Sequence, residues 1–252
     1  GGYRPYFAGY STFLQRAYDQ IVHDVCLQNL PVCILSDHVG LVGDDGKTHH
    51  GVLSVPMLMS IPNLTLLAPR DTRQIRQAVR ATLKLDGPCV VQYPKEGIEP
   101  YAQNVTGEPF AVGKWQTLIP GGQDAVILAY GRMTQNAIQA SELLVQRGLS
   151  VGVIDCCSLK PLDMDCLRAL FERRAKIVTI EEGEMIGGFG SEIARVCVEE
   201  NADAPVQIIG LENRFITHGS VPELLRECGL TPEQLADRIE EIAGDKESSH
   251  VG

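Results

Sequence analysis

The chain has 252 residues, 44% of them hydrophobic, so it can bury the core of one large domain or of two ordinary domains. Its 22 basic and 32 acidic residues give a net charge of −10, which excludes broad nonspecific attraction to nucleic acid or to anionic membranes. No apolar stretch of the sequence is long enough to span a bilayer.

The first part of the chain alternates helical and strand patterns. Apolar residues recur at helical spacing over residues 10–29, where Ser11 or Thr12 is a candidate amino-terminal cap, and the preceding residues lead into this helix. The further predicted elements are a buried strand at 31–36, a polar glycine-rich loop at 38–51, a strand at 64–68, a helix capped by Asp71 and a strand at 89–93. This alternation is typical of a mainly parallel sheet.

The regular pattern lapses between residues 95 and 123, where prolines and glycines indicate a linker with one short strand. A second alternating unit follows. Its predicted elements are strands at 125–130, 151–155, 177–180 and 206–211, and helices at 135–147, at 163–173, after Gly190 and twice near the end. We therefore expect an α/β fold with two successive three-layer αβα domains, at residues 1–100 and 123–244, joined by a linker at 101–122 and followed by a tail at 245–252.

The eight cysteines show neither a Cys-x-x-Cys pair nor the spacing of a zinc site, so no metal site is expected in this chain. Most lie within apolar runs, where a reduced thiol packs as a small hydrophobic group. Free buried thiols favour a cytoplasmic location. The chain begins Gly1-Gly2-Tyr3 without Met, which indicates that an upstream region has been removed.

The loop at residues 38–51 is the densest polar cluster, and it leaves the carboxyl end of a predicted parallel strand, where open α/β sheets form ligand sites. Asp45, His49 and His50 are suited to proton transfer or to contacts with substrate hydroxyls. The alternative is a solvated turn with incidental histidines. Long loops inside compact domains are usually functional or disordered, which favours a site.

The segments Tyr10-Ser-Thr-Phe-Leu-Gln-Arg-Ala-Tyr-Asp-Gln20 and Asp37–Gly51, with its Asp-Gly-Lys-Thr-His-His-Gly ending, resemble the pyrimidine-binding domain of the 1-deoxy-D-xylulose-5-phosphate synthase family. Later segments resemble the carboxyl-terminal domain of the transketolase superfamily. They are Lys160-Pro-Leu-Asp163, Glu181-Glu182 with Gly187-Gly-Phe-Gly-Ser191, and Phe215-Ile-Thr-His-Gly219. The resemblance covers nearly the whole chain.

The resemblance implies a thiamine diphosphate enzyme that joins pyruvate to glyceraldehyde 3-phosphate with loss of carbon dioxide, in isoprenoid and thiamine precursor synthesis. Phe13 matches the aromatic residue that stacks on the aminopyrimidine ring of the cofactor, although by itself it reads as a core residue of its helix. Tyr10 and Arg16 match residues near the cofactor and substrate. Asp45 and His49 match groups that contact substrate hydroxyls or assist proton transfer, and so are the candidate catalytic residues.

Two positions depart from the family pattern. His38 and Lys95 stand where the family usually has arginines that hold the substrate phosphate. Neither side chain reproduces the bidentate fork of an arginine, so weaker phosphate contacts or a different acceptor aldehyde are expected.

Two other family elements are absent from the sequence. The glutamate that activates the aminopyrimidine would lie just upstream of Gly1, and no Gly-Asp-Gly motif for magnesium and diphosphate is present. Magnesium is therefore expected from a separate domain. The implied partner is a second copy in a homodimer or a complementing diphosphate-binding domain or subunit, with no nucleic-acid or membrane partner.

Two remaining motifs are interpreted as structural. Gly187–Gly190 lacks the full nucleotide-binding fingerprint, so its glycines indicate close packing at a helix start. Glu181 and Glu182 are strand neighbours that point to opposite faces, which favours a structural or interface role over a catalytic pair. His218 either borders the site or caps a turn.

Two alternatives to the synthase remain open. The chain could be the small subunit of a split transketolase or the beta subunit of a 2-oxoacid dehydrogenase, both of which also lack the diphosphate domain. It could instead be a noncatalytic paralogue or fragment that acts through dimer contacts, an interpretation that His38 and Lys95 favour.

Overall fold

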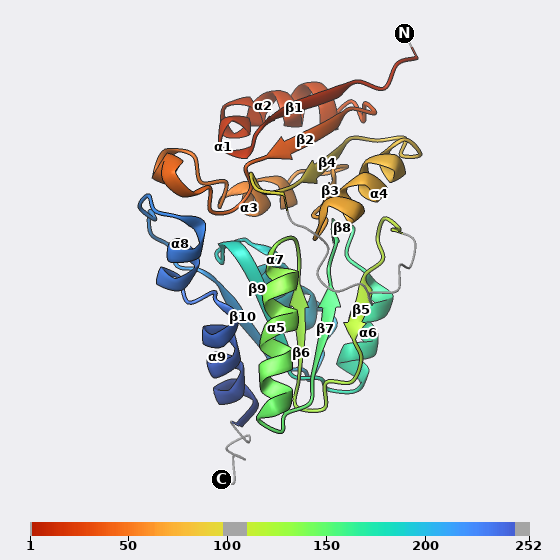
Figure 1. Ribbon diagram of the computed structural model, residues 1–252. Coiled ribbons are helices and arrows are strands. Elements are labelled where there is room, and N and C mark those ends of the chain that lie inside the picture. The colour runs from red at the N-terminus through yellow and green to blue at the C-terminus, as the bar shows by residue number, and fades with distance from the viewer. Residues whose placement is uncertain (1, 98–109, 245–252) are drawn as a thin grey trace.

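The computed structural model describes residues 2–97 and 110–244, which form two five-stranded sheets with helices on their faces (Figure 1). Figure 1 shows the first sheet above the second. The predicted tail at 245–252 and most of the amino-terminal half of the predicted linker, residues 101–109, lie outside the described residues. The division into domains at residues 100 and 123 stays a prediction.

The first sheet has the order β1-β2-β4-β3-β8 within the described residues, and every pair is parallel except β3 with β8. Its strands are β1 (Tyr6–Tyr10), β2 (Cys33–Asp37), β3 (Thr65–Leu67), β4 (Cys89–Gln92) and β8 (Ser158–Lys160). Its helices are a helical stretch composed of α1 (Ser11–Leu14), η1 (Gln15–Ala17), α2 (Tyr18–Gln20) and η2 (Ile21–Cys26), followed by η3 (Gly43–Thr48), α3 (Ser54–Met59) and α4 (Thr72–Thr82).

The second sheet has the order β10-β9-β6-β7-β5 within the described residues, and every pair is parallel except β5 with β7. Its strands are β5 (Gln116–Ile119), β6 (Ala125–Ala129), β7 (Val151–Asp155), β9 (Ile177–Glu184) and β10 (Val206–Leu211). Its helices are α5 (Met133–Gln146), α6 (Met164–Glu172), α7 (Phe189–Glu199), α8 (Val221–Glu227) and α9 (Pro232–Gly244). β5 is the short strand predicted within the linker.

Each sheet is covered on both faces. Alternate side chains of its strands point to opposite faces and so enter different cores. In the first sheet, Ile34 and Val90 pack with the helical stretch 11–26 and α3, whereas Cys33 and Val91 pack with α4. In the second sheet, one face packs with α6 and α7 and the other with α5 and α9. The predicted α/β class and mainly parallel sheets are confirmed. None of the helices in the described part of the chain is long and apolar enough to cross a membrane.

Four details differ from the sequence predictions. Residues before the first helix form the edge strand β1 instead of leading into the helix, and the amino-terminal cap is Tyr10, without a capping side chain. The predicted loop contains the short helix η3, and α3 follows it. β8, from the second half of the chain, completes the first sheet. These elements are short or depend on pairing with distant residues, which a local pattern does not encode.

A buried polar network also joins the two halves. Arg70, next to the cap of α4, forms an ion pair with the fully buried Asp155 at the end of β7. Gln74 Nε2 donates to the same carboxylate at 2.7 Å, and Arg70 donates to Gln116 Oε1 at 2.7 Å. The two sheets are thus tied by buried charge as well as by apolar packing.

Candidate functional site

The predicted site residues gather at the carboxyl edge of the first sheet. β1 and β2 are paired in register so that Tyr10 lies opposite Asp37, and Ser36 lies opposite Gln92 at the end of β4. Parallel strands end at the same edge, so the start of α1, the loop after β2 and the segment after β4 converge there. The site therefore follows from the order of the strands.

Four aromatic and imidazole rings form a cluster at this edge. The rings of Tyr10 and His38 are stacked with centroids 3.7 Å apart, and the rings of Tyr10 and Phe13 are parallel at 5.5 Å. The ring of His49 meets Phe13 edge-on at 5.5 Å. His38 is buried, with backbone φ +60°, whereas Phe13 is 47% exposed. Phe13 is therefore not a core residue of its helix, and it presents a flat apolar face.

Asp45 and Lys95 face each other across the site. Nζ of Lys95 donates to Oδ2 of Asp45 at 2.6 Å. This hydrogen bond lowers the pKa of Asp45, and the charges of Lys95, His49 and His38 act in the same direction. The same hydrogen bond raises the pKa of Lys95. Asp45 is accordingly held as a carboxylate and Lys95 as an ammonium.

Hydrogen bonds close the base of the loop that carries Asp45 and His49 and hold its interior. Gly51 N donates to Gly40 O at 2.8 Å. Nδ1 of the buried His50 accepts from Val42 N at 3.1 Å, and its Nε2 contacts Thr217 O at 2.9 Å. Because a carbonyl accepts, His50 carries its proton on Nε2. His50 therefore acts as a structural link to the second half of the chain, not as a free base.

A tight turn brings the loop against the motif that contains His218. Gly46 has φ +69°, and a Cβ at this position would lie 3.1 Å from Cβ of His218. A glycine is favoured here because an L side chain rarely adopts this backbone conformation. His218 therefore borders the loop.

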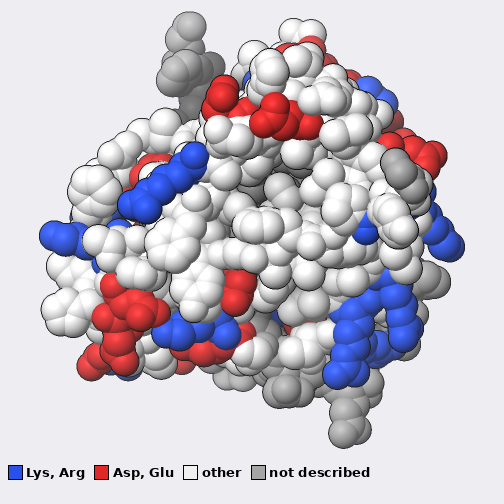
Figure 2. All heavy atoms as spheres, turned by 90° about the horizontal axis from the view of Figure 1, so that it is seen from above, with Lys and Arg blue, Asp and Glu red and all other residues white. Residues whose placement is uncertain are grey.

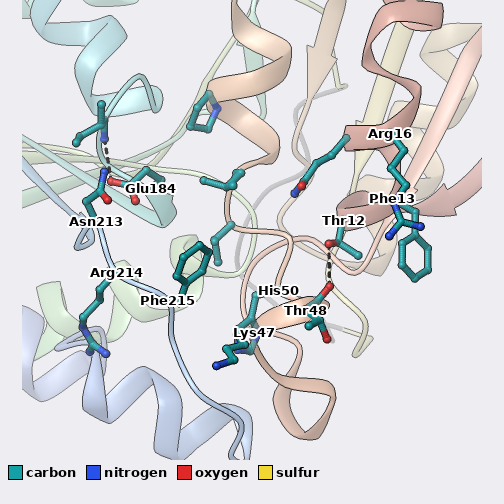
Figure 3. A pocket seen from close by; sticks show the side chains of 15 residues that line it. Thr12, Phe13, Arg16, Lys47, Thr48, His50, Glu184, Asn213, Arg214 and Phe215 are labelled. Carbon is teal, nitrogen blue, oxygen red and sulfur yellow. Dashed lines mark hydrogen bonds between the residues drawn. The ribbon is translucent and has the colours of Figure 1, made fainter.

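A cleft of ≈ 690 Å³ lies beside the cluster, between the two halves of the chain (Figure 3). Phe13 and Arg16 line it from the first half, and Phe215 lines it from the second. Figure 3 shows Phe215 in the middle of the view, Phe13 and Arg16 on one side and Lys47 below. Thr12 Oγ1 donates to Thr48 O at 3.1 Å and connects the helix to the loop.

Lys47 and Phe215 line the cleft but were not singled out as site residues. Both stand inside the motifs that carry the family resemblance, which is the signal that could have identified them. Phe215 is 84% exposed, and a large aromatic side chain in that state often marks a binding surface. On the face seen from above, separate groups of acidic and basic side chains lie on a mainly uncharged surface (Figure 2).

The two adjacent acids on β9 point in opposite directions. The fully buried Glu181 accepts hydrogen bonds from the backbone of Phe189 and Gly190 at 2.9 Å and so caps α7. Burial raises the pKa of Glu181 to about 7. Glu182 instead accepts from Leu41 N at 2.8 Å. The geometry supports the structural interpretation of both acids.

Two glycines at the start of α7 also have packing roles. A Cβ on Gly188 would lie 2.3 Å from Glu184 O, and one on Gly190 would lie 2.4 Å from Thr179 Oγ1.

Among the residues that the structure describes, no group of three or more His, Cys, Asp or Glu side chains is placed to hold a metal ion.

Comparison with known proteins matches both halves of the chain. Residues 1–99 match the family model of the transketolase pyrimidine binding domain, and residues 113–235 match that of the transketolase C-terminal domain. Proteins named 1-deoxy-D-xylulose-5-phosphate synthase are similar, at 40% identity in Rippkaea orientalis and 42% in Geobacillus thermodenitrificans. These matches cover 96% and 98% of this chain, which spans only 38% and 39% of the two relatives.

A solved structure described as a split gene transketolase, inactive beta4 tetramer, superimposes with a TM-score of 0.85 at 28% identity. The match covers 96% of this chain and 77% of that chain. Together with the two family models, these similarities identify the chain as a member of the transketolase superfamily that carries its pyrimidine-binding and carboxyl-terminal domains.

Proposed function

We propose that this chain is the pyrimidine-binding and carboxyl-terminal part of a thiamine diphosphate-dependent 1-deoxy-D-xylulose-5-phosphate synthase. The observation that carries the proposal is the exposed ring of Phe13, which lies beside His49 and opens onto a cleft. An apolar ring that stays half exposed contributes only part of its possible burial free energy to folding. Stacking with a flat ligand ring would cover the rest of its surface. The similarity to the named synthases supports the same assignment.

The residues of this chain would hold and orient the reactants. Phe13 would stack on the aminopyrimidine, while Tyr10 and Arg16 would line the pocket around it. Asp45 and His49 would contact substrate hydroxyls and move protons, and His38 and Lys95 would flank the acceptor aldehyde. When bound, thiamine diphosphate supplies the electron sink for decarboxylation of pyruvate. Magnesium and the diphosphate would be held by a separate domain, in the same polypeptide or in another.

Lys95 and His38 make strong phosphate binding unfavourable at this edge. Lys95 is already paired with Asp45, and the ring of His38 is buried and covered by the ring of Tyr10. The true acceptor would therefore be bound less tightly through its phosphate than an arginine pair would allow.

A split transketolase is the second candidate, because the solved structure of such a protein resembles this chain over 96% of its length. That protein is described as an inactive tetramer of its beta chains. A subunit of this kind would need a separate partner, or a second copy with it, to complete the site. The two candidates differ in the donor that they use, pyruvate for the synthase and a ketose phosphate for a transketolase.

Complementation tests the proposal. The chain would be mixed with the remaining, diphosphate-binding part of the Geobacillus thermodenitrificans relative, and release of carbon dioxide from pyruvate would be measured with thiamine diphosphate and magnesium. We expect turnover that depends on both polypeptides, that Phe13→Ala abolishes and that Val198→Ala, at an exposed position on α7, preserves. Turnover of a ketose phosphate but not of pyruvate would favour the transketolase.

Cofactor binding by the chain alone provides an independent check. We expect weak binding of thiamine diphosphate with magnesium, or none, because the diphosphate carries most of the charge that a binding site recognises. Tight binding by the isolated chain, measured by calorimetry, would contradict the assignment of the diphosphate to a separate domain.

A further inference from the structure

Glu182, from the carboxyl-terminal domain, supports the base of the site loop. Its side chain is 8% exposed, and its Oε1 accepts from Leu41 N at 2.8 Å. Gly40, with φ +77°, allows this approach, since a Cβ there would lie 2.6 Å from the carboxyl carbon of Glu182. The segment that leads to Asp45 therefore starts on a buried carboxylate of the other domain.

Arg132, at the start of α5, connects this carboxylate to the other site segment. Its Nε lies 3.5 Å from Oε2 of Glu182, and its Nη1 lies 3.7 Å from Oε2 of Glu96, the residue after Lys95. The arginine side chain is only 10% exposed. Its two Nη atoms form no hydrogen bond with any described residue, so it attracts the buried Glu182 and the 57% exposed Glu96 by charge alone.

The far end of the loop is also held by the carboxyl-terminal domain. Glu184 N donates to Val52 O at 3.0 Å, and His50 Nε2 donates to Thr217 O at 2.9 Å. Both ends of the loop that carries Asp45 and His49 are thus fastened to β9 or to the segment after β10. The loop has little freedom to move independently of the second domain.

We propose that Glu182 and Arg132 are positioning residues that set the separation of Asp45 and Lys95 across the site. Glu182 fixes the segment that carries Asp45, and Arg132 fixes the segment that carries Lys95. The two residues form one buried ion pair. The positions of both segments therefore depend on the same pair of side chains. The importance of this geometry for catalysis rests on the proposed function, but the geometry itself exists in the isolated chain.

The adjacent acids Glu181 and Glu182 provide a matched pair of variants. The readout is the pKa of the Asp45 carboxyl, followed by carbon-13 NMR in the isolated chain, because it reports the contact with Lys95. Lys95→Gln removes the contact and gives the full rise of this pKa. We expect Glu182→Gln to give roughly half of that rise or more. Glu181→Gln, whose carboxylate faces α7, should leave it unchanged.

Substitutions of Arg132 separate positioning from general stability. Arg132→Gln should raise the Asp45 pKa, and Arg132→Lys, which keeps the charge, should restore most of the original value. The double variant Glu182→Gln with Arg132→Gln leaves no unpaired buried charge, which guards against unfolding, and should also raise the pKa because the connection to Glu96 is lost.

The proposal would be overturned if the pKa of Asp45 in Glu182→Gln and in the double variant equalled its value in the original chain. An equal rise in Glu181→Gln would also overturn it, because the effect would then reflect loosening of the whole domain. Neither result depends on cofactor or turnover, so a failure of this inference is distinguishable from a failure of the proposed function.

Discussion

Nζ of Lys95 lies 2.6 Å from Oδ2 of Asp45, so two groups expected to contact substrate neutralise each other. A phosphate that approaches Lys95 is repelled by the negative charge of this carboxylate. We predict that Asp45→Asn raises the affinity of the isolated chain for inorganic phosphate by about two- to fivefold, a small change because ion pairs between exposed side chains are weak. Chemical-shift titration of the Lys95 side chain would measure the affinity.

The control for this prediction is the double variant Asp45→Asn with Lys95→Gln, which should lose the gain. An affinity for phosphate that is the same in the original chain and in Asp45→Asn would show that Lys95 is not masked by Asp45.

The neighbouring residues Phe13 and Leu14 differ in burial, which separates a binding role from a folding role. Leu14 is 3% exposed and Phe13 is 47% exposed. Leu14→Ala should lower the free energy of unfolding by about 2–4 kcal/mol, whereas Phe13→Ala should lower it by less than about 1 kcal/mol. Denaturant unfolding monitored by circular dichroism measures both. Equal losses would mean that the Phe13 ring supports the core.

Glu181 should make stability depend on pH. Burial raises its pKa from 4.5 to about 7 in the folded chain. An acid whose pKa is raised by folding contributes most stability below about pH 4.5, and that contribution is lost as the pH rises through about 7. Between pH 5 and pH 8, the free energy of unfolding should fall by on the order of 3 kcal/mol through this group alone.

Glu181→Gln isolates this contribution. The amide keeps the shape and one acceptor for the amino terminus of α7 but does not titrate, so the variant should show a flatter dependence over the same range. Identical pH profiles for the two proteins, measured by denaturant unfolding, would place the titration on another group.

The ion pair between Arg70 and Asp155 should be costly to break. Both residues are buried, at 9% and 0% exposure, and each belongs to a different half of the chain. Arg70→Met leaves the carboxylate of Asp155 uncompensated, so the free energy of unfolding should fall by about 3–5 kcal/mol. The exposed pair of Arg195 and Glu199 on α7 is the control, and Arg195→Met there should cost less than about 1 kcal/mol. Similar losses in the two variants would argue against the buried network as a link between the halves.

Most regular elements could be predicted from local patterns. The apolar runs that became β2, β4, β6 and β7 are continuous because both of their faces are covered, and Asp71 and Asp163 cap α4 and α6 through their side chains. The strands β1 and β8 could not be predicted in this way. β1 is an exposed edge strand, and β8 has only three residues and pairs with a strand far away in the sequence.

The sequence by itself determined the α/β class, the family resemblance and the residue types at the site, because periodicity, caps and motifs are local properties of the chain. Only the tertiary structure decided that Phe13 is exposed, that Asp45 is paired with Lys95 and that His50 is a structural link. The reason is that burial and pairing depend on which distant segments share the end of a sheet, and the order of the strands sets that arrangement.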